Sequence, residues 1–511
     1  MKNIFKISIA ALAGVTLLAS CSKDYLNTTP TSSTATATIF ESTDNAALAI
    51  NGICKLMTRQ YLSSQGFNGE GTVKLYAGEY PGDNLFVNLP GWASVINANF
   101  HDNKITIYNY YNWYYYYMLI GNANAIIANI DGAKGGENEK QFIKAQALSF
   151  RAYSYMMLLQ LYSVRWSDSN NGAADGVVLR LDTSTDEMPL STMAECYKQV
   201  YDDLDEAISL YTASELKPDS DDNYSPNIDM AYATYARAAL NKQDYSKAAE
   251  MAAKARENHP LMSNEEYKAG FSTPNKEWIW SCYGSADETL FFYSYFAYVS
   301  YNSSASAVRT YPKCISKEFY DRIPETDLRK GMFLDPKDYS YTKSTGLAGK
   351  ELTAHARSLY PAIYSTAKVY AYMNFKFANV AQPGVGNLNN FRSAEMYLIE
   401  AEANYFLKNE KAAQAAMNAL TKDSGRDPEY NCSATGADLL EEIKLYRRIE
   451  LFGEGFNWFD LKRLGDSMKR KDPDNGGNFL AALAVSYDSK DRNNWTWVIP
   501  SRETDYNKLI K

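Results

Sequence analysis

Two stretches of the chain repeat one pattern, and this repeat constrains the fold more than any other sequence feature. Residues 231–252 and residues 395–416 each contain an alanine-rich segment, a short polar turn and a second alanine-rich segment. Small side chains let two antiparallel helices pack closely, as in tetratricopeptide repeats. Such a helical pair cannot bury its apolar face alone, so several pairs must stack. The pattern therefore predicts a mainly α-helical scaffold of stacked pairs.

Four further segments carry apolar residues at the 3.6-residue period that is typical of helices. They are residues 44–61, 110–130, 141–162 and 192–210. Thr192 followed by Glu195 is a typical helix start, because a hydroxyl caps free N–H groups and a carboxylate favours the positive end of the helix. Together with the two repeats, these segments predict helical pairs over about 44–130, 141–210, 229–258 and 391–420, the first two of them degenerate.

The stretch from about residue 260 to residue 390 has a different character. It is rich in Ser, Gly, Tyr and Asn, and it shows little helical periodicity. We expect an irregular, loop-rich insert with short strands at 278–280 and 290–293. A long loop-rich insert between helical repeats more often carries function than not, so we look for a ligand site there.

The first 21 residues resemble a bacterial lipoprotein signal. Lys2 and Lys6 precede a short apolar run, which ends in Leu18-Ala19-Ser20-Cys21. The run is too short to span a bilayer, and no later apolar run reaches that length. We therefore predict a signal peptide over 1–20, a lipid on Cys21, a flexible tether over 21–38 and one domain over 39–511. An ordinary secretory signal with an incidental cysteine is the alternative.

Composition and motifs argue against several functions. The formal net charge of −8 becomes more negative once the leader is removed, so the surface repels phosphate backbones and nucleic acid is not an expected partner. The three histidines are scattered, and no zinc ribbon, phosphate loop or nucleophile elbow appears. Asp219–Asn223 begins like a calcium loop, but Tyr224 replaces the required glycine, so we read a solvated loop. We expect no metal, no cofactor and no enzymatic activity.

The charged segment 447–463 invites a catalytic interpretation. Glu450 and Glu454 are four residues apart, so on a helix they would share a face. Adjacent arginines would keep both carboxylates ionised, which is unsuitable for a general acid. We therefore predict a structural ion-pair network, and we expect Arg151 and Arg392 each to pair with a carboxylate as well.

Ordered motifs run along nearly the whole chain. They include 21–26, 122–130, 144–153, 392–403, 447–463 and 497–500. Their joint order and spacing resemble the SusD/RagB family of outer-membrane lipoproteins of Bacteroidota. The resemblance implies a mainly α-helical scaffold of about four tetratricopeptide-like pairs beneath an irregular part that carries the ligand site. It also implies a non-enzymatic protein on the cell surface, which captures oligosaccharides, or sometimes peptides, for a SusC-like TonB-dependent transporter.

Aromatic residues on loops are the candidates for sugar contacts, because the C–H face of a sugar ring stacks on flat aromatic rings while its hydroxyls pair with Asn, Asp and Tyr. Trp92 lies on a Pro-Gly loop with no evident core role, in a region that often supplies a stacking aromatic in the family. The tyrosine-rich run 108–117 leads into a helix, and we expect it to serve mainly in packing. The candidate ligand-binding residues are Trp92, Asn97, Asn99, Tyr283, Tyr298 and Tyr301.

Several functions stay open at this point. The main hypothesis is capture of oligosaccharides and their delivery to a SusC-like transporter. The alternatives are capture of peptides or glycopeptides on the same fold, a surface hydrolase, and a purely structural partner of the transporter. The sequence does not determine the identity, linkage or length of a glycan ligand.

Overall fold

Helices form most of the protein in the computed structural model, which describes residues 38–62, 67–97, 99–219, 221–285, 293–488 and 495–510. The predicted signal peptide, the lipidated Cys21 and nearly all of the tether lie outside these residues, as does most of the strand expected at 290–293. Among the helices within these ranges, none combines the length and apolar character that a membrane span needs.

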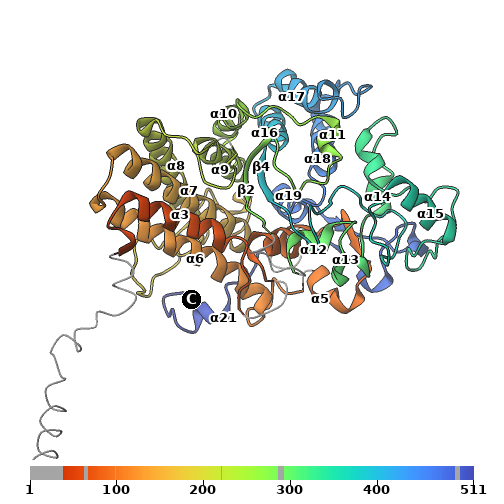
Figure 1. Cartoon of the computed structure of the whole chain (residues 1–511), viewed down its shortest axis with the longest axis horizontal. Coiled ribbons are helices and arrows are strands. Elements are labelled where there is room, and N and C mark those ends of the chain that lie inside the picture. The colour runs from red at the N-terminus through yellow and green to blue at the C-terminus, as the bar shows by residue number, and fades with distance from the viewer. Residues whose placement is uncertain are drawn as a thin grey trace, which may run out of the picture.

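The long helices stack side by side in sequence order along one side of the molecule (Figure 1). α6 (Ile107–Asn129) packs against α7 (Glu137–Tyr162), and α7 packs against α8 (Met193–Ser214). α3 (Thr43–Leu56) contacts both α6 and α7. The four helices expected in this half of the chain are therefore present, and each predicted boundary lies within a few residues of the observed one.

The two alanine-rich repeats form the helical hairpins that the sequence predicts. The first hairpin is α9 (Ile228–Asn241) with α10 (Tyr245–Arg256), and the second is α16 (Ser393–Phe406) with α17 (Glu410–Asn418). Alanines such as Ala238 and Ala252 are completely buried, and α10 packs directly on α16. The mainly α-helical scaffold of helical pairs is thus confirmed.

Helix ends follow local capping chemistry. Thr192 accepts a hydrogen bond from the backbone N–H of Glu195, and the Glu195 carboxylate accepts one from the backbone N–H of Thr192. This reciprocal arrangement satisfies two donors that the start of α8 would otherwise leave free, as expected from the sequence.

Residues 57–106 separate α3 from α6, so these two helices do not form a simple hairpin. This segment forms α4 (Gly69–Thr72), the π-helical turn η2 (Val73–Glu79), β1 (Leu85–Val87), the 3-10 turn η3 (Pro90–Trp92) and α5 (Ala93–Ile96). Strand β1 pairs antiparallel with β3 (Lys313–Ile315). The pairing fixes the segment that carries Trp92 against the predicted insert.

The insert itself is irregular, with short elements. β2 (Trp278–Cys282) pairs antiparallel with β4 (Leu388–Arg392), which confirms the strand expected at 278–280. The short helices between them are α12 (Tyr295–Val299), α13 (Ser306–Arg309), α14 (Lys317–Tyr320) and α15 (Lys350–Leu359), and α11 (Asn264–Tyr267) precedes β2. Further 3-10 or π turns lie at Ile130–Gly132, Trp166–Asp168, Leu328–Met332, Ala419–Asp423, Pro473–Asn475 and Ala481–Leu483.

The C-terminal part of the chain, from residue 436 onward, forms two helices and several short elements. It contains α18 (Gly436–Glu450), α19 (Asn457–Leu464), the paired short strands β5 (Met468–Lys469) and β6 (Ser486–Tyr487), and α21 (Ser501–Thr504). α18 packs on α16 and α17, which connects this part to the helical scaffold.

A buried ion-pair network joins β4, α18 and the insert, as the sequence predicts. The Arg392 guanidinium donates to Glu277 at 2.8 Å, to Glu450 at 2.6 Å and to Glu454 at 2.7 Å. The expectation that Glu450 and Glu454 share a helix face is wrong, because α18 ends at Glu450. The chain turns at Gly453, where φ is +78°, and the turn returns Glu454 to the same arginine.

Both carboxylates stay ionised for a clear physical reason. Burial alone would raise the pKa of Glu450, but Arg392 and Arg329 outweigh burial and hold that pKa well below its usual range. Burial likewise opposes ionisation of Glu454, and Arg392 and Lys376 lower its pKa. Neither group is suited to donate a proton as a general acid at neutral pH.

Other packing predictions also hold. Arg151 pairs with Asp203 at 2.6 Å, and both side chains are buried. Within the tyrosine-rich run, Tyr111, Tyr115 and Tyr116 are completely buried in α6. The five cysteines in the described part of the chain are buried and free.

Candidate functional site

Three segments that are far apart in the sequence meet around the ring of Tyr76, which lies on η2. Trp92 follows β1, Tyr108 lies in the first turn of α6, and Tyr298 lies on α12. Their ring centroids lie 5.5, 5.9 and 6.3 Å from that of Tyr76, respectively. In Figure 1, α5 and α12 lie in the same lower region of the molecule, in agreement with the ring contact of Trp92 with Tyr298. We call Tyr76, Trp92, Phe100, Tyr108 and Tyr298 the Tyr76 cluster.

The cluster has a buried base and an accessible upper part. Tyr76 and Tyr298 are only 6% and 7% exposed, whereas Trp92, Phe100 and Tyr108 are half-buried. Phe100 and Tyr108 are stacked, with centroids 4.5 Å apart and planes within 8°. Rings that contact one another in this way keep their orientation. The accessible rings are therefore pre-organised to stack against flat apolar faces of a ligand.

The polypeptide around Trp92 is fixed by polar contacts. The Trp92 N–H donates to the Leu89 carbonyl at 3.0 Å, and the Asn88 side chain donates to the Thr345 carbonyl at 2.7 Å. The second contact links this loop to the insert. Trp92 thus lies in a hydrogen-bonded turn of a loop that Asn88 attaches to the insert.

Asn97, which the sequence suggests as a ligand contact, is used within the fold. Its side-chain oxygen accepts from Arg470 at 2.9 Å, and its side-chain nitrogen donates to the Ala482 carbonyl at 3.1 Å. Arg470 is buried and also binds the carbonyls of Tyr80 and Ile96. Asn97 is itself buried, and its side chain completes the set of hydrogen-bond acceptors around the Arg470 guanidinium. We therefore leave Asn97 out of the proposed site.

The other predicted residues fall in different places. Asn99 is exposed and directly precedes Phe100 of the Tyr76 cluster, so it stays a candidate. The Tyr301 ring lies 5.4 Å from that of Tyr360 and belongs to a different group of rings. Tyr283 is 45% exposed and contacts Tyr224 edge-on at 5.2 Å. The structure therefore brings Trp92 and Tyr298 together, and places Tyr283 and Tyr301 in other ring contacts.

Three residues of the cluster were not among the predicted contacts. Tyr108 belongs to the run assigned to packing, but it lies in the first turn of α6, where it contacts Tyr76 and Phe100. For Phe100, the sequence offers one weak indication of a role in the site, which is its position next to the predicted contact Asn99. Nothing in the local sequence distinguishes Tyr76, because its role arises from the meeting of distant segments.

The chemistry of the cluster is that of an uncharged surface. Burial raises the pKa of Tyr108 and of Tyr298, so both hydroxyls are neutral at physiological pH and both donate and accept hydrogen bonds. Within the ranges that the structure describes, no three His, Cys, Asp or Glu side chains are arranged to hold a metal ion. The arrangement favours a neutral ligand with apolar faces and many hydroxyls.

Comparisons with known proteins agree with this architecture. Residues 65–240 match a family model described as "starch-binding associating with outer membrane". A SusD-like carbohydrate-binding protein from Bacteroides vulgatus is 24% identical, with a TM-score of 0.73 over 92% of this chain and 98% of that chain. A SusD superfamily protein from Bacteroides thetaiotaomicron is 22% identical, with a TM-score of 0.69 over 92% of this chain and 99% of that chain. These two structures share the fold of this protein. A search of curated protein sequences found no match to this chain.

The C-terminal part of the chain supplies the family assignment. Residues 239–511 match the model of the SusD family, and this match covers more than half of the chain. The helical pairs, the irregular insert and the motifs from Arg392 onward all agree with that match. The protein belongs to the SusD family.

Proposed function

We propose that the protein is a cell-surface lipoprotein that captures oligosaccharides and delivers them to a SusC-like TonB-dependent transporter in the outer membrane. The match of residues 65–240 to starch-binding proteins associated with the outer membrane supports this proposal. One structural relative, from Bacteroides vulgatus, is a SusD-like carbohydrate-binding protein, which points the same way. A lipid on Cys21 is the proposed membrane attachment, and the mechanism is capture without bond cleavage.

The observation that carries the proposal is the half-exposed group of Trp92, Phe100 and Tyr108 on its buried base. Flat rings contact the C–H faces of sugars, and nearby hydroxyls and the Asn99 amide pair with sugar hydroxyls. Each sugar contributes modest affinity. Several sugars bound together, with closure against the transporter, raise the overall affinity through effective concentration.

A glycan array followed by calorimetric titration tests ligand capture. We expect Trp92→Ala to weaken binding of the best glycan by about tenfold or more, as is typical of a central aromatic contact. Trp166→Ala is the matched control, because Trp166 is also half-buried and packs on one tyrosine, Tyr197. Equal affinity of both variants and the unmodified protein would refute the assignment of this site.

Further arms of the experiment separate the alternatives. A peptide array run in parallel distinguishes glycan capture from capture of peptides or glycopeptides. Hydrolysis assays on any bound glycan should show no product. Co-purification with a TonB-dependent transporter, and loss of uptake in a strain that carries Trp92→Ala, test delivery. Unchanged uptake in that strain would favour a purely structural partner.

A further inference from the structure

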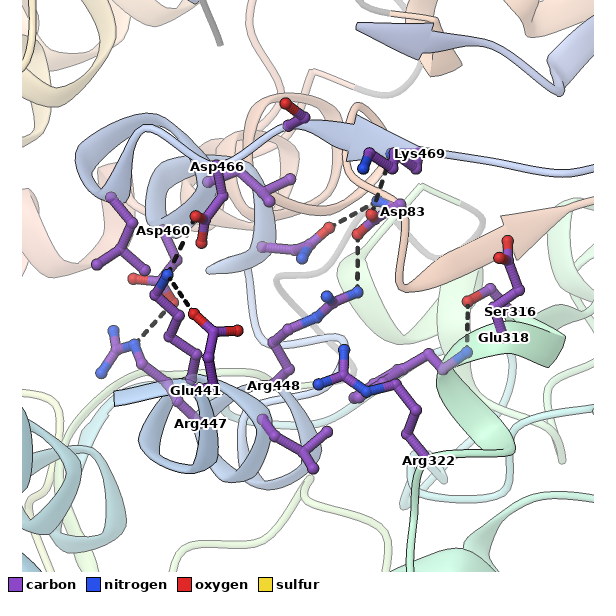
Figure 2. Close-up of a pocket in the computed structure, with 17 residues that line it drawn as sticks. Asp83, Ser316, Glu318, Arg322, Glu441, Arg447, Arg448, Asp460, Asp466 and Lys469 are labelled. Atoms are coloured by element: carbon purple, nitrogen blue, oxygen red, sulfur yellow. Dashed lines mark hydrogen bonds and ion pairs between the residues drawn. The ribbon is translucent and has the colours of Figure 1, made fainter. Parts of the chain in front are cut away.

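A cavity lies among the C-terminal helices and is separate from the Tyr76 cluster. It has a volume of about 470 Å³ and opens between α18, α19, β5 and the end of α14 (Figure 2). No ring of the Tyr76 cluster lines it. Small-molecule sites in proteins usually enclose about 300–1,000 Å³, so this cavity has the size of a ligand site.

Charged side chains of both signs line the cavity in equal number. The cations are Arg322, Lys444, Arg447, Arg448 and Lys469. The carboxylates are Asp83, Glu318, Glu441, Asp460 and Asp466. The cavity is therefore close to neutral as a whole. Most of these charges are paired: Arg447 binds Asp460 at 2.7 Å, and Lys444 binds Asp466 at 3.1 Å.

Arg322 is not among these paired charges, because its guanidinium forms no hydrogen bond or ion pair with any residue that the structure describes (Figure 2). Figure 2 shows it extending beside Arg448 on the side of the cavity opposite Asp460 and Asp466. Partial burial and then the like charge of Arg448 lower the pKa of Arg322. Two guanidinium groups are thus held close together, although an anion between them would relieve their repulsion.

Arg448 is rigidly positioned for such an anion. It donates to Asn84 at 2.7 Å and to Asp83 at 2.8 Å, and it lies over the ring of Phe319 at 4.8 Å. These contacts use Nε and Nη2 and leave Nη1 for a ligand. Planar guanidinium groups bind carboxylates through parallel hydrogen bonds.

We infer that this cavity binds a uronic acid residue, with its carboxylate between Arg322 and Arg448 and its hydroxyls toward the acidic wall. The inference goes beyond capture at the Tyr76 cluster, because it adds a second site with a different ligand chemistry. Glu441 and Asp466 provide acceptors for sugar hydroxyls at the far side of the cavity. Phe319 and Leu445 provide an apolar surface for the ring.

The balance of charges explains why a uronate fits better than a phosphate. A dianion would gain from two arginines, but it would also face five carboxylates in the same cavity. A monoanion that carries several hydroxyls satisfies both parts of the cavity. An uncharged sugar would supply no counter-ion to Arg322 and would leave its repulsion with Arg448 in place.

Titration of the protein with galacturonate tests the inference, with galactose as the matched neutral sugar. We expect galacturonate to bind, and to bind more weakly at high salt because screening weakens the ion pairs. Arg322→Gln should weaken galacturonate binding about tenfold or more, since it removes a charge-assisted pair. This variant should fold normally, because the Arg322 side chain is largely exposed and makes no hydrogen bond or ion pair with the described residues.

Matched controls separate this site from the first one. Arg59→Gln removes the same charge at another exposed position and should leave galacturonate binding unchanged. Trp92→Ala should also leave galacturonate binding unchanged. The experiment can therefore refute the proposal for the Tyr76 cluster and the inference for this cavity independently of each other. Galactose, acetate or phosphate binding as tightly as galacturonate would overturn the inference. Unchanged affinity in Arg322→Gln, or the absence of galacturonate binding, would do so too.

Discussion

Replacing Arg392 by methionine is the sharpest test of the forces that hold the irregular part to the scaffold. The Arg392 side chain is 1% exposed, and it donates to Glu277, Glu450 and Glu454. Arg329 and Lys376 neutralise part of the same group through Glu450 and Glu454. Methionine keeps much of the apolar stem but removes the charge and all five of the guanidinium N–H donors.

The magnitude follows from what the substitution leaves behind. Removal of one partner of a buried ion pair typically costs about 3–5 kcal/mol, because an uncompensated charge stays buried. Here Glu450 and Glu454 still pair with Arg329 and Lys376 after the substitution. We therefore expect the free energy of unfolding to fall by about 3–4 kcal/mol at pH 7.5, which is less than the sum of three separate pairs. The Glu450 carbonyl also loses its bond of 2.9 Å from Arg392, which adds to the loss.

The pH dependence has a definite sign. In the unmodified protein the pKa values of Glu450 and Glu454 are lowered, so their contribution is present above the unfolded-state pKa of about 4.5 and is lost as the pH falls through the folded-state values. Without Arg392, burial dominates and raises these pKa values. Folding of the variant then takes up protons, so its deficit in stability should be smaller at pH 5 than at pH 7.5.

Urea unfolding followed by tryptophan fluorescence at both pH values measures these quantities. Arg392→Lys is the matched control, because lysine keeps the positive charge with fewer hydrogen-bond donors. Its free energy of unfolding should fall by less than that of the methionine variant. Lys198→Met removes an exposed ion pair with Asp202 and should change the free energy of unfolding by less than about 1 kcal/mol. A deficit for Arg392→Met below about 1 kcal/mol, or one equal at both pH values, would refute the reasoning.

Three further substitutions test local packing by thermal unfolding. Lys462→Met removes donors to the carbonyls of the residues that end α7 and should cost about 1–3 kcal/mol; a loss within error would contradict the buried contacts. A Cβ at Gly82 would lie 1.7 Å from the nearest side-chain oxygen, so Gly82→Ala should lower the melting temperature, whereas Gly52→Ala, with open space, should not. Asn97→Leu should destabilise the protein through Arg470 and leave the glycan affinity of the folded fraction unchanged; a specific loss of affinity would return Asn97 to the site.

The candidate site shows where local sequence reasoning stops. Trp92 was predicted from its Pro-Gly loop, which gives a large ring no evident place in a core. Tyr108 and Tyr111 belong to one run, yet the first is half-exposed and the second is completely buried. Tyr108 stacks on the half-buried Phe100, whereas Tyr111 is enclosed by Tyr61, Phe67 and Tyr115. The arrangement of Arg322 beside Arg448 has no local signal either, because the two residues come from separate elements.

The sequence by itself determines the helical pairs, and it predicts the lipoprotein leader and the ion pairing of the C-terminal motif. These properties follow from periodicity, small side chains and residue spacing, which act over a few turns of the chain. Only the tertiary structure decides which aromatic rings stay accessible around Tyr76. It also decides that Arg322 has no counter-ion among the described residues, while Arg392 has three. The physical reason is that burial and pairing depend on contacts between segments far apart in the chain, and such contacts leave no periodic trace in the sequence.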